Sequence, residues 1–194
     1  DGNDDLILPA AEPGLLDIYA GKGDGMFHSP ALMGPIGEEP SFLLARDLDV
    51  DGHADLVAAT SGSSLPLLWG LGGDAFVEAG SILPWSSLAR SVRAGDVNRN
   101  GLPDFFVRTI AREILVHIDP EPGSGAGRAT RVETSSPCDF FEVADLDGDG
   151  IPDLAGANAA SGEVIAALLD PGGRVRREVI LESCGIPSAI EVAD

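Results

Sequence analysis

Short apolar segments, each too brief for a helix, recur along the whole chain. In one period they cover residues 42–45, 56–59, 65–69 and 75–79, and turns rich in glycine and aspartate separate them. No window keeps apolar residues at the i, i+3, i+4 and i+7 positions of an amphipathic helix over three turns. Segments of this length, bounded by turn residues, are typical of β-strands. The pattern therefore predicts an all-β chain.

The predicted strands repeat together with an aspartate-rich loop. Its complete copies are DLDVDGHADL from Asp47, DVNRNGLPDF from Asp96 and DLDGDGIPDL from Asp145, at a constant period of 49 residues. The chain opens inside another copy, because DGNDDL matches residues 51–56, and its last residue, Asp194, begins one more. The period predicts one repeat domain, residues 1–194, with blades near 1–40, 41–89, 90–138 and 139–187, and residues 188–194 starting the next.

About four antiparallel strands per repeat is the content of a β-propeller blade. We therefore expect a β-propeller of about four blade equivalents. Two arrangements stay open: part of a larger ring, or a small closed ring in which residues 190–192 supply the first strand of the opening blade. A repeat cannot bury its apolar face alone, so adjacent blades are its expected neighbours.

The loop presents hard oxygen ligands at alternate positions. In the first complete copy, aspartates occupy positions one, three, five and nine, and Gly52 at position six takes the positive φ that closes the turn. The backbone carbonyl of His53, at position seven, then points inward. Such a cage suits the six to eight oxygens that Ca²⁺ prefers better than the tight octahedron of Mg²⁺.

An EF-hand shares the Asp-x-Asp-x-Asp-Gly opening but requires a glutamate at position twelve and flanking helices. Position twelve is Ala58, Val107 and Gly156 in the three copies, and strands are predicted on both sides of each loop. The sequence therefore predicts calcium loops of another class.

The motif Asp-x-Asp-x-Asp-Gly-x-x-Asp-Leu at this period, with GKGDGMF between copies, resembles the FG-GAP/VCBS repeats of integrin α-chain propellers and many bacterial surface proteins. In that family the loop joins the first and second strands of a blade. The resemblance implies three complete calcium sites and a fourth split between the chain ends. The implied ligands are Asp47, Asp49, Asp51, His53 and Asp55; Asp96, Asn98, Asn100, Leu102 and Asp104; Asp145, Asp147, Asp149, Ile151 and Asp153; and Asp1, Asn3, Asp5 and Asp194.

The middle loop differs in charge from its neighbours. Asn98 and Asn100 leave it with a formal charge of −2 from its side-chain ligands, whereas the loops at Asp47 and Asp145 each carry −4. Affinity in oxygen cages follows ligand charge as well as rigidity, so the middle site is expected to be the weakest. The turn at residues 119–123 also departs from the family pattern.

Composition narrows the class of partner. The net charge is −20, from 32 acidic and 12 basic residues, and such a surface repels nucleic-acid phosphates and anionic membranes. No apolar run approaches the roughly 18 residues of a membrane span. The opening residues are not a signal peptide, so any targeting segment is expected outside this stretch.

The two cysteines, Cys138 and Cys184, are too few for a disulfide framework. Separate thiols are favoured over a disulfide bridge between blades.

The sequence offers little catalytic chemistry. His28, His53 and His117 fall at non-equivalent repeat positions, and Tyr19 and Lys22 are the only residues of their types. We therefore expect that the protein is not an enzyme. We expect an extracellular, cell-surface or periplasmic binding module, in which calcium is structural and the partner is a glycan or a protein. The alternative is the propeller part of a secreted carbohydrate-active enzyme, since polysaccharide lyases resemble this family.

Overall fold

The computed structural model describes residues 2–34, 36–37, 39–62, 65–73, 75–82, 88–119, 128–182 and 185–193. Every helix or strand assigned within these ranges is a β-strand, and the strands form four antiparallel sheets. The predicted all-β class is therefore confirmed. No described element is a helix able to cross a membrane. The chain divides into two compact units with the boundary between residues 92 and 93, and each unit is described by itself.

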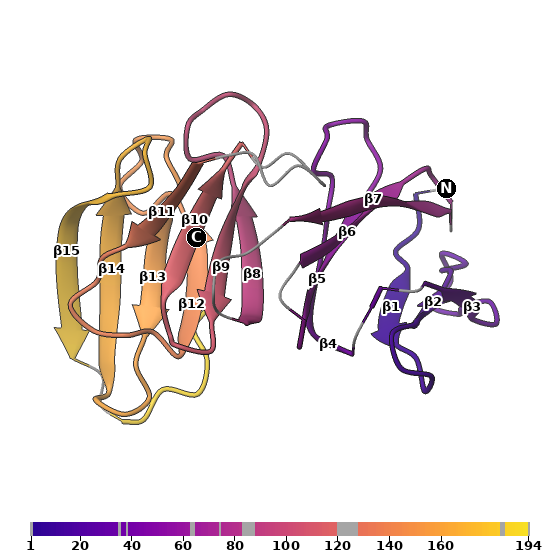
Figure 1. Ribbon diagram of the computed structural model, residues 1–194, viewed down its shortest axis with the longest axis horizontal. Helices are drawn as coiled ribbons and strands as arrows, with labels where there is room; N and C mark the ends of the chain where they lie inside the picture. The colour runs from indigo at the N-terminus through magenta and orange to yellow at the C-terminus, as the bar shows by residue number, and fades with distance from the viewer. Residues whose placement is uncertain are drawn as a thin grey trace. The chain divides into compact units, whose positions relative to one another are not determined.

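The first unit contains two sheets (Figure 1). One has the order β1-β2-β3, and the other has the order β4-β5-β6-β7. Their strands are β1 (Leu6–Pro9), β2 (Leu16–Tyr19), β3 (Ala31–Met33), β4 (Pro40–Arg46), β5 (Asp55–Thr60), β6 (Leu65–Gly70) and β7 (Phe76–Ile82). Within each sheet every strand pairs with the next one in the sequence, which is the topology of a propeller blade.

Strand β5 shows why the sequence lacks a simple alternation of apolar and polar residues. All six of its residues are buried, so both of its faces are covered and each position requires a side chain that tolerates burial. Leu56 and Ala58 of β5 join Leu16, Ile36 and Leu68 in the hydrophobic core of this unit.

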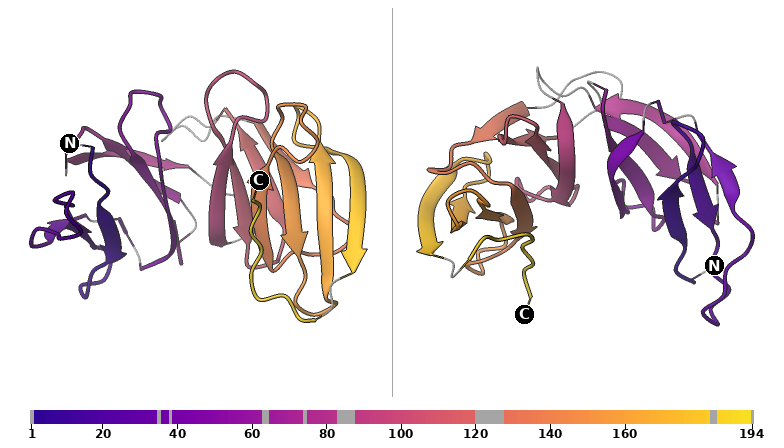
Figure 2. Two further views of the ribbon diagram at one scale, coloured as in Figure 1. Left: turned by 180° about the vertical axis from the view of Figure 1, so that it is seen from behind. Right: turned by 90° about the horizontal axis from the view of Figure 1, so that it is seen from below.

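The second unit contains two four-stranded sheets, seen from two further sides in Figure 2. Their orders are β11-β10-β9-β8 and β12-β13-β14-β15. The strands are β8 (Ala89–Gly95), in which the unit boundary falls, β9 (Asp104–Thr109), β10 (Ile114–Ile118), β11 (Arg128–Val132), β12 (Phe140–Ala144), β13 (Asp153–Ala157), β14 (Glu163–Leu169) and β15 (Val175–Glu182).

These two sheets share one hydrophobic core. Phe106 and Val116 from one sheet pack in a single cluster with Leu154, Ile165 and Leu169 from the other, and all five side chains are fully buried. Burying a side chain of this size contributes roughly 1.5–3 kcal/mol. Neither sheet could cover this apolar face alone, as expected for stacked repeats.

Each aspartate-rich loop joins the first and second strands of a sheet, as the family resemblance implies. The complete loops lie between β4 and β5, β8 and β9, and β12 and β13. The predicted strand at residues 190–192 is wrong, because these residues belong to no strand. In the complete copies the equivalent strand pairs with the one that follows the loop. The blade boundaries stay a prediction.

Candidate metal centres

The aspartate at position one holds each complete loop in its turn. Both carboxylate oxygens of Asp47 accept backbone N–H groups, from Asp51 at 3.2 Å and from Gly52 at 3.0 Å. Asp96 and Asp145 make the same pair of bonds at 2.8–3.1 Å in their loops. The glycines that donate the second bond, Gly52, Gly101 and Gly150, have φ values of 92°, 89° and 80°, a conformation that residues with a Cβ rarely adopt.

The aspartate at position nine ties the loop to the strand pair behind it. Asp55 is completely buried, and its oxygens accept the N–H groups of Leu48 at 2.7 Å and Gly70 at 2.8 Å. Asp104 and Asp153 repeat this arrangement. Burial raises the pKa of both carboxyls, partly offset by these hydrogen bonds.

The opening half-loop shares this feature. The Oδ1 atom of Asp5 accepts the N–H of Gly21 at 2.8 Å, which corresponds to the bond from Gly70 to Asp55. Asn3 also lies here and donates from Nδ2 to the carbonyl of Gly21 at 3.4 Å. Asp1 and Asp194, predicted to contribute to the split site, lie outside the described residues.

Positions three and five are built differently from positions one and nine. The Oδ1 atom of Asp49 accepts the N–H of Asp51 at 3.2 Å, and the Oδ1 atom of Asp51 accepts the N–H of His53 at 2.8 Å. The same bonds recur in the other two complete loops. At these positions one oxygen serves the backbone of the loop, and the second terminal atom of the side chain is left for other partners.

The first and third loops bring three carboxylates together. Asp47, Asp49 and Asp55 each place one oxygen within 4.8 Å of the others, and Asp145, Asp147 and Asp149 do the same. Oxygens that bind one Ca²⁺ at roughly 2.3–2.6 Å lie no more than about 5 Å apart, so both groups fit this ion. Asp51 and Asp153, also predicted ligands, are outside these two groups.

The electrostatics of the first group favour a cation. Burial, together with the negative charges of Asp55, Asp51 and Asp47, raises the pKa of Asp49 above its ordinary value. Carboxylates that repel one another in this way are stabilised when a divalent ion enters, because the ion is then the largest local charge. The residues of the first and third loops would supply side-chain oxygens, and the carbonyls of His53 and Ile151 occupy position seven.

The middle loop has an acidic partner that the sequence did not reveal. The Oδ1 atom of Asp119 accepts hydrogen bonds from Nδ2 of Asn98 at 2.8 Å and Nδ2 of Asn100 at 2.5 Å. The backbone N–H of Asp119 also donates to Asp104. Asp119 follows β10 and stands in the turn that departs from the family pattern, which was the one signal that could have drawn attention to it.

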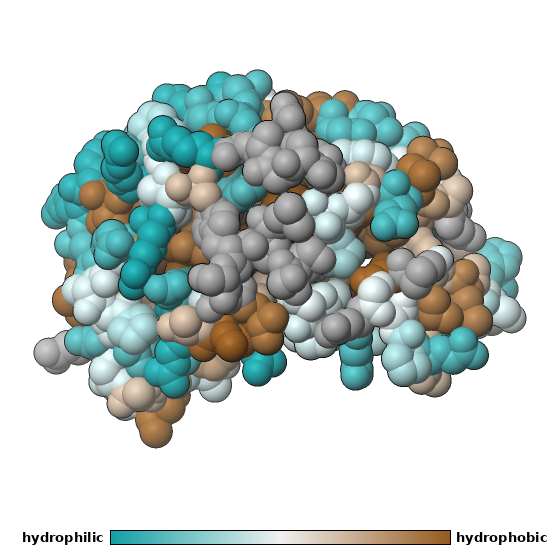
Figure 3. All heavy atoms as spheres, in the orientation of Figure 1, coloured by the Kyte–Doolittle hydropathy of each residue, from teal (hydrophilic) through white to brown (hydrophobic). Residues whose placement is uncertain are grey.

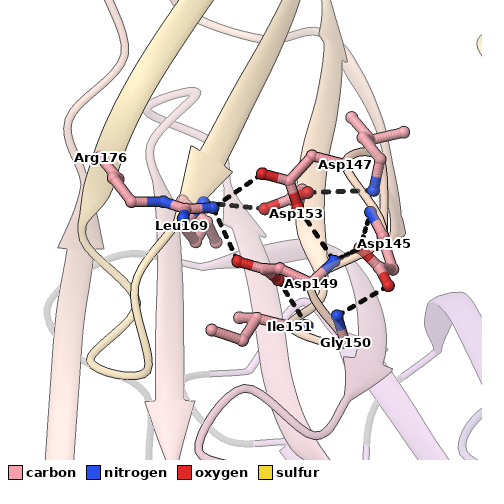
Figure 4. Close-up of polar contacts among 10 residues, drawn as sticks. Asp145, Asp147, Asp149, Gly150, Ile151, Asp153, Leu169 and Arg176 are labelled. Carbon is pink, nitrogen blue, oxygen red and sulfur yellow. Dashed lines mark hydrogen bonds and ion pairs between the residues drawn. The ribbon is translucent and has the colours of Figure 1, made fainter.

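The third loop has a basic partner. Arg176 of β15 donates from Nη2 to Oδ2 of Asp147 at 2.9 Å and to Oδ2 of Asp149 at 2.8 Å, as Figure 4 shows. These carboxylates are the predicted ligands at positions three and five. Nothing in the spacing of the motif indicates an arginine 29 residues after Asp147.

Comparison with known proteins agrees with this geometry. Residues 47–107, which contain the first two complete loops, match the FG-GAP-like repeat family. The sequence matches no curated protein.

Among the solved structures that share the fold are the following two. One is a lectin of Agrocybe aegerita that recognises non-reducing terminal N-acetylglucosamine, with a TM-score of 0.62 and 19% identity over 89% of this chain. The other is BBS1N, solved in complex with ARL6DN, with a TM-score of 0.59 and 14% identity over 91% of this chain. The chain spans 47% and 50% of those two chains, about half their length. This protein therefore carries an FG-GAP-like repeat and has the fold of part of a β-propeller.

Proposed function

We propose that this protein is a calcium-stabilised β-propeller module that binds a partner and catalyses no reaction itself. The observation that carries the proposal is the convergence of three carboxylates in each of two repeated loops, at Asp47 and at Asp145. The FG-GAP-like match over residues 47–107 supports calcium as the ion. The middle loop and the split loop at the chain ends are proposed as further sites, for a total of four.

Calcium acts here as a structural ion. Each complete loop joins the first two strands of a sheet, and its position-nine aspartate is hydrogen-bonded into that sheet, so filling the loop stabilises the sheet directly. An ion that binds only the folded state, at about 1,000 times its dissociation constant, adds roughly 4 kcal/mol per site. Sites of this kind are filled at extracellular calcium concentrations, so we propose that the protein is extracellular, at the cell surface or in the periplasm. Recovery of the native protein in a cytosolic fraction would contradict this location.

The calcium proposal is tested by thermal unfolding with excess calcium and with excess chelator. We expect chelation to lower the Tm by many degrees, and re-addition of calcium, but not of magnesium at the same concentration, to restore it. Superimposable unfolding curves in calcium and in chelator would refute the structural role of the ion.

Additional blades are proposed as neighbours of this chain. The chain spans about half of the propeller structures that it matches. The first sheet exposes large apolar side chains, including Leu8 at 49% and Leu32 at 61%. Hydrophobic residues reach the surface at several places on the face drawn in Figure 3. A further repeat would cover such side chains, as neighbouring sheets do in the second unit.

A glycan is the partner that we favour, because one structure of similar fold belongs to a lectin. The second unit offers a hollow of about 530 Å³ lined by Arg108, Arg112, Asp139 and Phe140. Guanidinium groups and an aromatic ring provide hydrogen bonds and an apolar surface for a sugar. A glycan array probed with the calcium-loaded protein should show binding that Arg112→Ala weakens, whereas Arg177→Ala should not. An array without signal, together with a protein captured from the native surroundings, would favour a protein partner.

The second candidate function is the propeller part of a secreted carbohydrate-active enzyme. It rests on the family resemblance, and no cluster of catalytic side chains in the described residues supports it. Turnover of acidic polysaccharides by the purified chain would establish it.

A further inference from the structure

Two residues outside the repeat motif contact the ligand positions of neighbouring loops and carry opposite charges. Arg176 bridges Asp147 and Asp149 in the third loop, whereas Asp119 bridges Asn98 and Asn100 in the middle loop. In both loops the bridged side chains are those of positions three and five. All of these residues belong to the second unit.

The contact in the third loop leaves the hydrogen bonds of the loop intact. The Oδ1 atoms of Asp147 and Asp149 accept backbone N–H groups at 3.3 Å and 2.9 Å, and the guanidinium binds their Oδ2 atoms. Arg176 is 45% exposed, and the two carboxylates are about 30% exposed. The positive charge therefore lies at the rim of the loop, where water weakens its field but does not abolish it.

A second guanidinium lies close to the third loop. A Cβ atom placed on Gly150 would lie 2.6 Å from Nη2 of Arg99, which occupies position four of the middle loop. The equivalent residues in the other two complete loops are Val50 and Gly148. The third loop therefore has two basic side chains near it, Arg176 in direct contact and Arg99 beside its glycine.

In the middle loop the side chain that contacts positions three and five is negatively charged. The Oδ1 atoms of Asn98 and Asn100 accept backbone N–H groups. Each of these bonds orients the side-chain amide so that its Nδ2 atom faces away from the loop backbone. Both Nδ2 atoms donate to Asp119. A carboxylate that accepts hydrogen bonds from two amides also polarises them, which makes their carbonyl oxygens more negative.

We propose that Arg176 and Asp119 tune the calcium affinities of the third and middle loops by adding one charge of opposite sign to each. The proposal rests on the calcium binding proposed above. The side chains at the ligand positions give formal charges of −4 and −2; when only the partners hydrogen-bonded to those side chains are added, each loop has −3. The two loops then bind calcium with similar affinities, rather than the third loop far more tightly than the middle one.

The experiment is a calcium titration followed at the backbone amides of Gly101 and Gly150 in ¹H–¹⁵N NMR spectra. Each amide donates to the position-one aspartate of its own loop, so each signal reports on one site. Arg176→Gln should tighten the site reported by Gly150 on the order of three- to tenfold and leave the Gly101 site unchanged. Arg177→Gln removes the same charge from the next residue of β15 and is the matched control. Arg176→Lys, which keeps the charge, should behave as the unmodified protein does.

The complementary variant is Asp119→Asn. Asp119 has a φ of 51°, a conformation that asparagine also tolerates, so the backbone should keep its course. We expect the site reported by Gly101 to weaken on the order of three- to tenfold. The control is Glu133→Gln, which removes a carboxylate that is 77% exposed in the same unit.

The outcomes separate this inference from the proposed function. If calcium shifts neither glycine signal, the proposed calcium sites are refuted and the tuning with them. If calcium shifts both signals but Arg176→Gln and Arg177→Gln have equal effects, the calcium sites stand and the tuning is refuted. A preserved spectrum in the calcium-free state shows that each variant is folded, so that a changed affinity reflects the site.

Discussion

The change Asp153→Asn tests whether the position-nine aspartate is mainly a metal ligand or mainly part of the fold. Asp153 is completely buried, and its Oδ1 and Oδ2 atoms accept the N–H groups of Leu169 at 2.8 Å and Leu146 at 3.0 Å. Asparagine has the same shape but only one oxygen. Its NH₂ group would face a backbone N–H, and one of the two donors would lose its acceptor.

The expected loss in the free energy of unfolding comes from the one backbone N–H that no longer has an acceptor. Leaving a buried N–H without an acceptor costs roughly 1–3 kcal/mol, and the remaining bond becomes weaker because the acceptor is no longer charged. Removal of the charge offsets part of this destabilisation. Burial raises the pKa of Asp153, which means that the folded state disfavours the charged form of its carboxyl group. We expect a net loss of about 2 kcal/mol in the free energy of unfolding.

The assay is urea unfolding in excess chelator, where no metal contributes. Asp147→Asn is the matched control, because it removes the same charge at a residue whose ion pair with Arg176 is partly exposed and is worth at most about 1 kcal/mol. Exchange of the Leu169 amide with solvent should also accelerate in Asp153→Asn. Equal urea midpoints for Asp153→Asn and the unmodified protein in chelator would refute the reasoning and leave Asp153 with a ligand role alone.

Two further predictions concern buried titratable groups. Burial raises the pKa of the Cys138 thiol to about 11, so this free cysteine should resist alkylation at pH 8 in the folded protein and react once it is unfolded, as measured by peptide mass spectrometry. Burial lowers the pKa of His117 below 6.5, so the unfolded chain binds this proton first as the pH falls. The contribution of His117 to the free energy of unfolding should be complete above pH 6.5 and decline below it by at most about 1.4 kcal/mol per pH unit. His117→Gln should remove this part of the pH dependence, and the exposed His28→Gln should leave it in place. A reactive Cys138 in the folded state, or a pH dependence unchanged by His117→Gln, would contradict the assigned burial.

The sequence predicted the repeat and its loops because both depend on local spacing. A 49-residue period and a glycine at position six are visible in one dimension, and the structure places each complete loop between the first two strands of a sheet. Asp119 and Arg176 were not predicted as parts of the site. They reach the loops only after β10 and β15 have folded beside them, and no motif spacing records a contact of that kind. Cys138 is a buried free thiol, and Cys184, the other cysteine of the predicted pair of separate thiols, lies outside the described residues.

The pattern of substitution among the three loops has a physical explanation that the sequence alone did not supply. Positions one and nine are aspartate in every complete copy, whereas positions three and five are asparagine in the middle loop. At position one, as in Asp96, and at position nine, as in Asp104, both carboxylate oxygens accept backbone N–H groups. An asparagine side chain at either position would point its NH₂ group, which is a donor, at one of these backbone N–H donors.

At positions three and five only one oxygen accepts a backbone N–H, and in the middle and third loops the other terminal atom faces a partner outside the motif. Asn98 and Asn100 therefore keep the loop geometry and lose only charge. The motif thus separates into positions that fold the loop, which are one, six and nine, and positions that set its charge, which are three and five. It follows that the middle loop should keep its conformation with its two asparagines, and we expect any difference between the loops in calcium affinity to arise from charge rather than from shape.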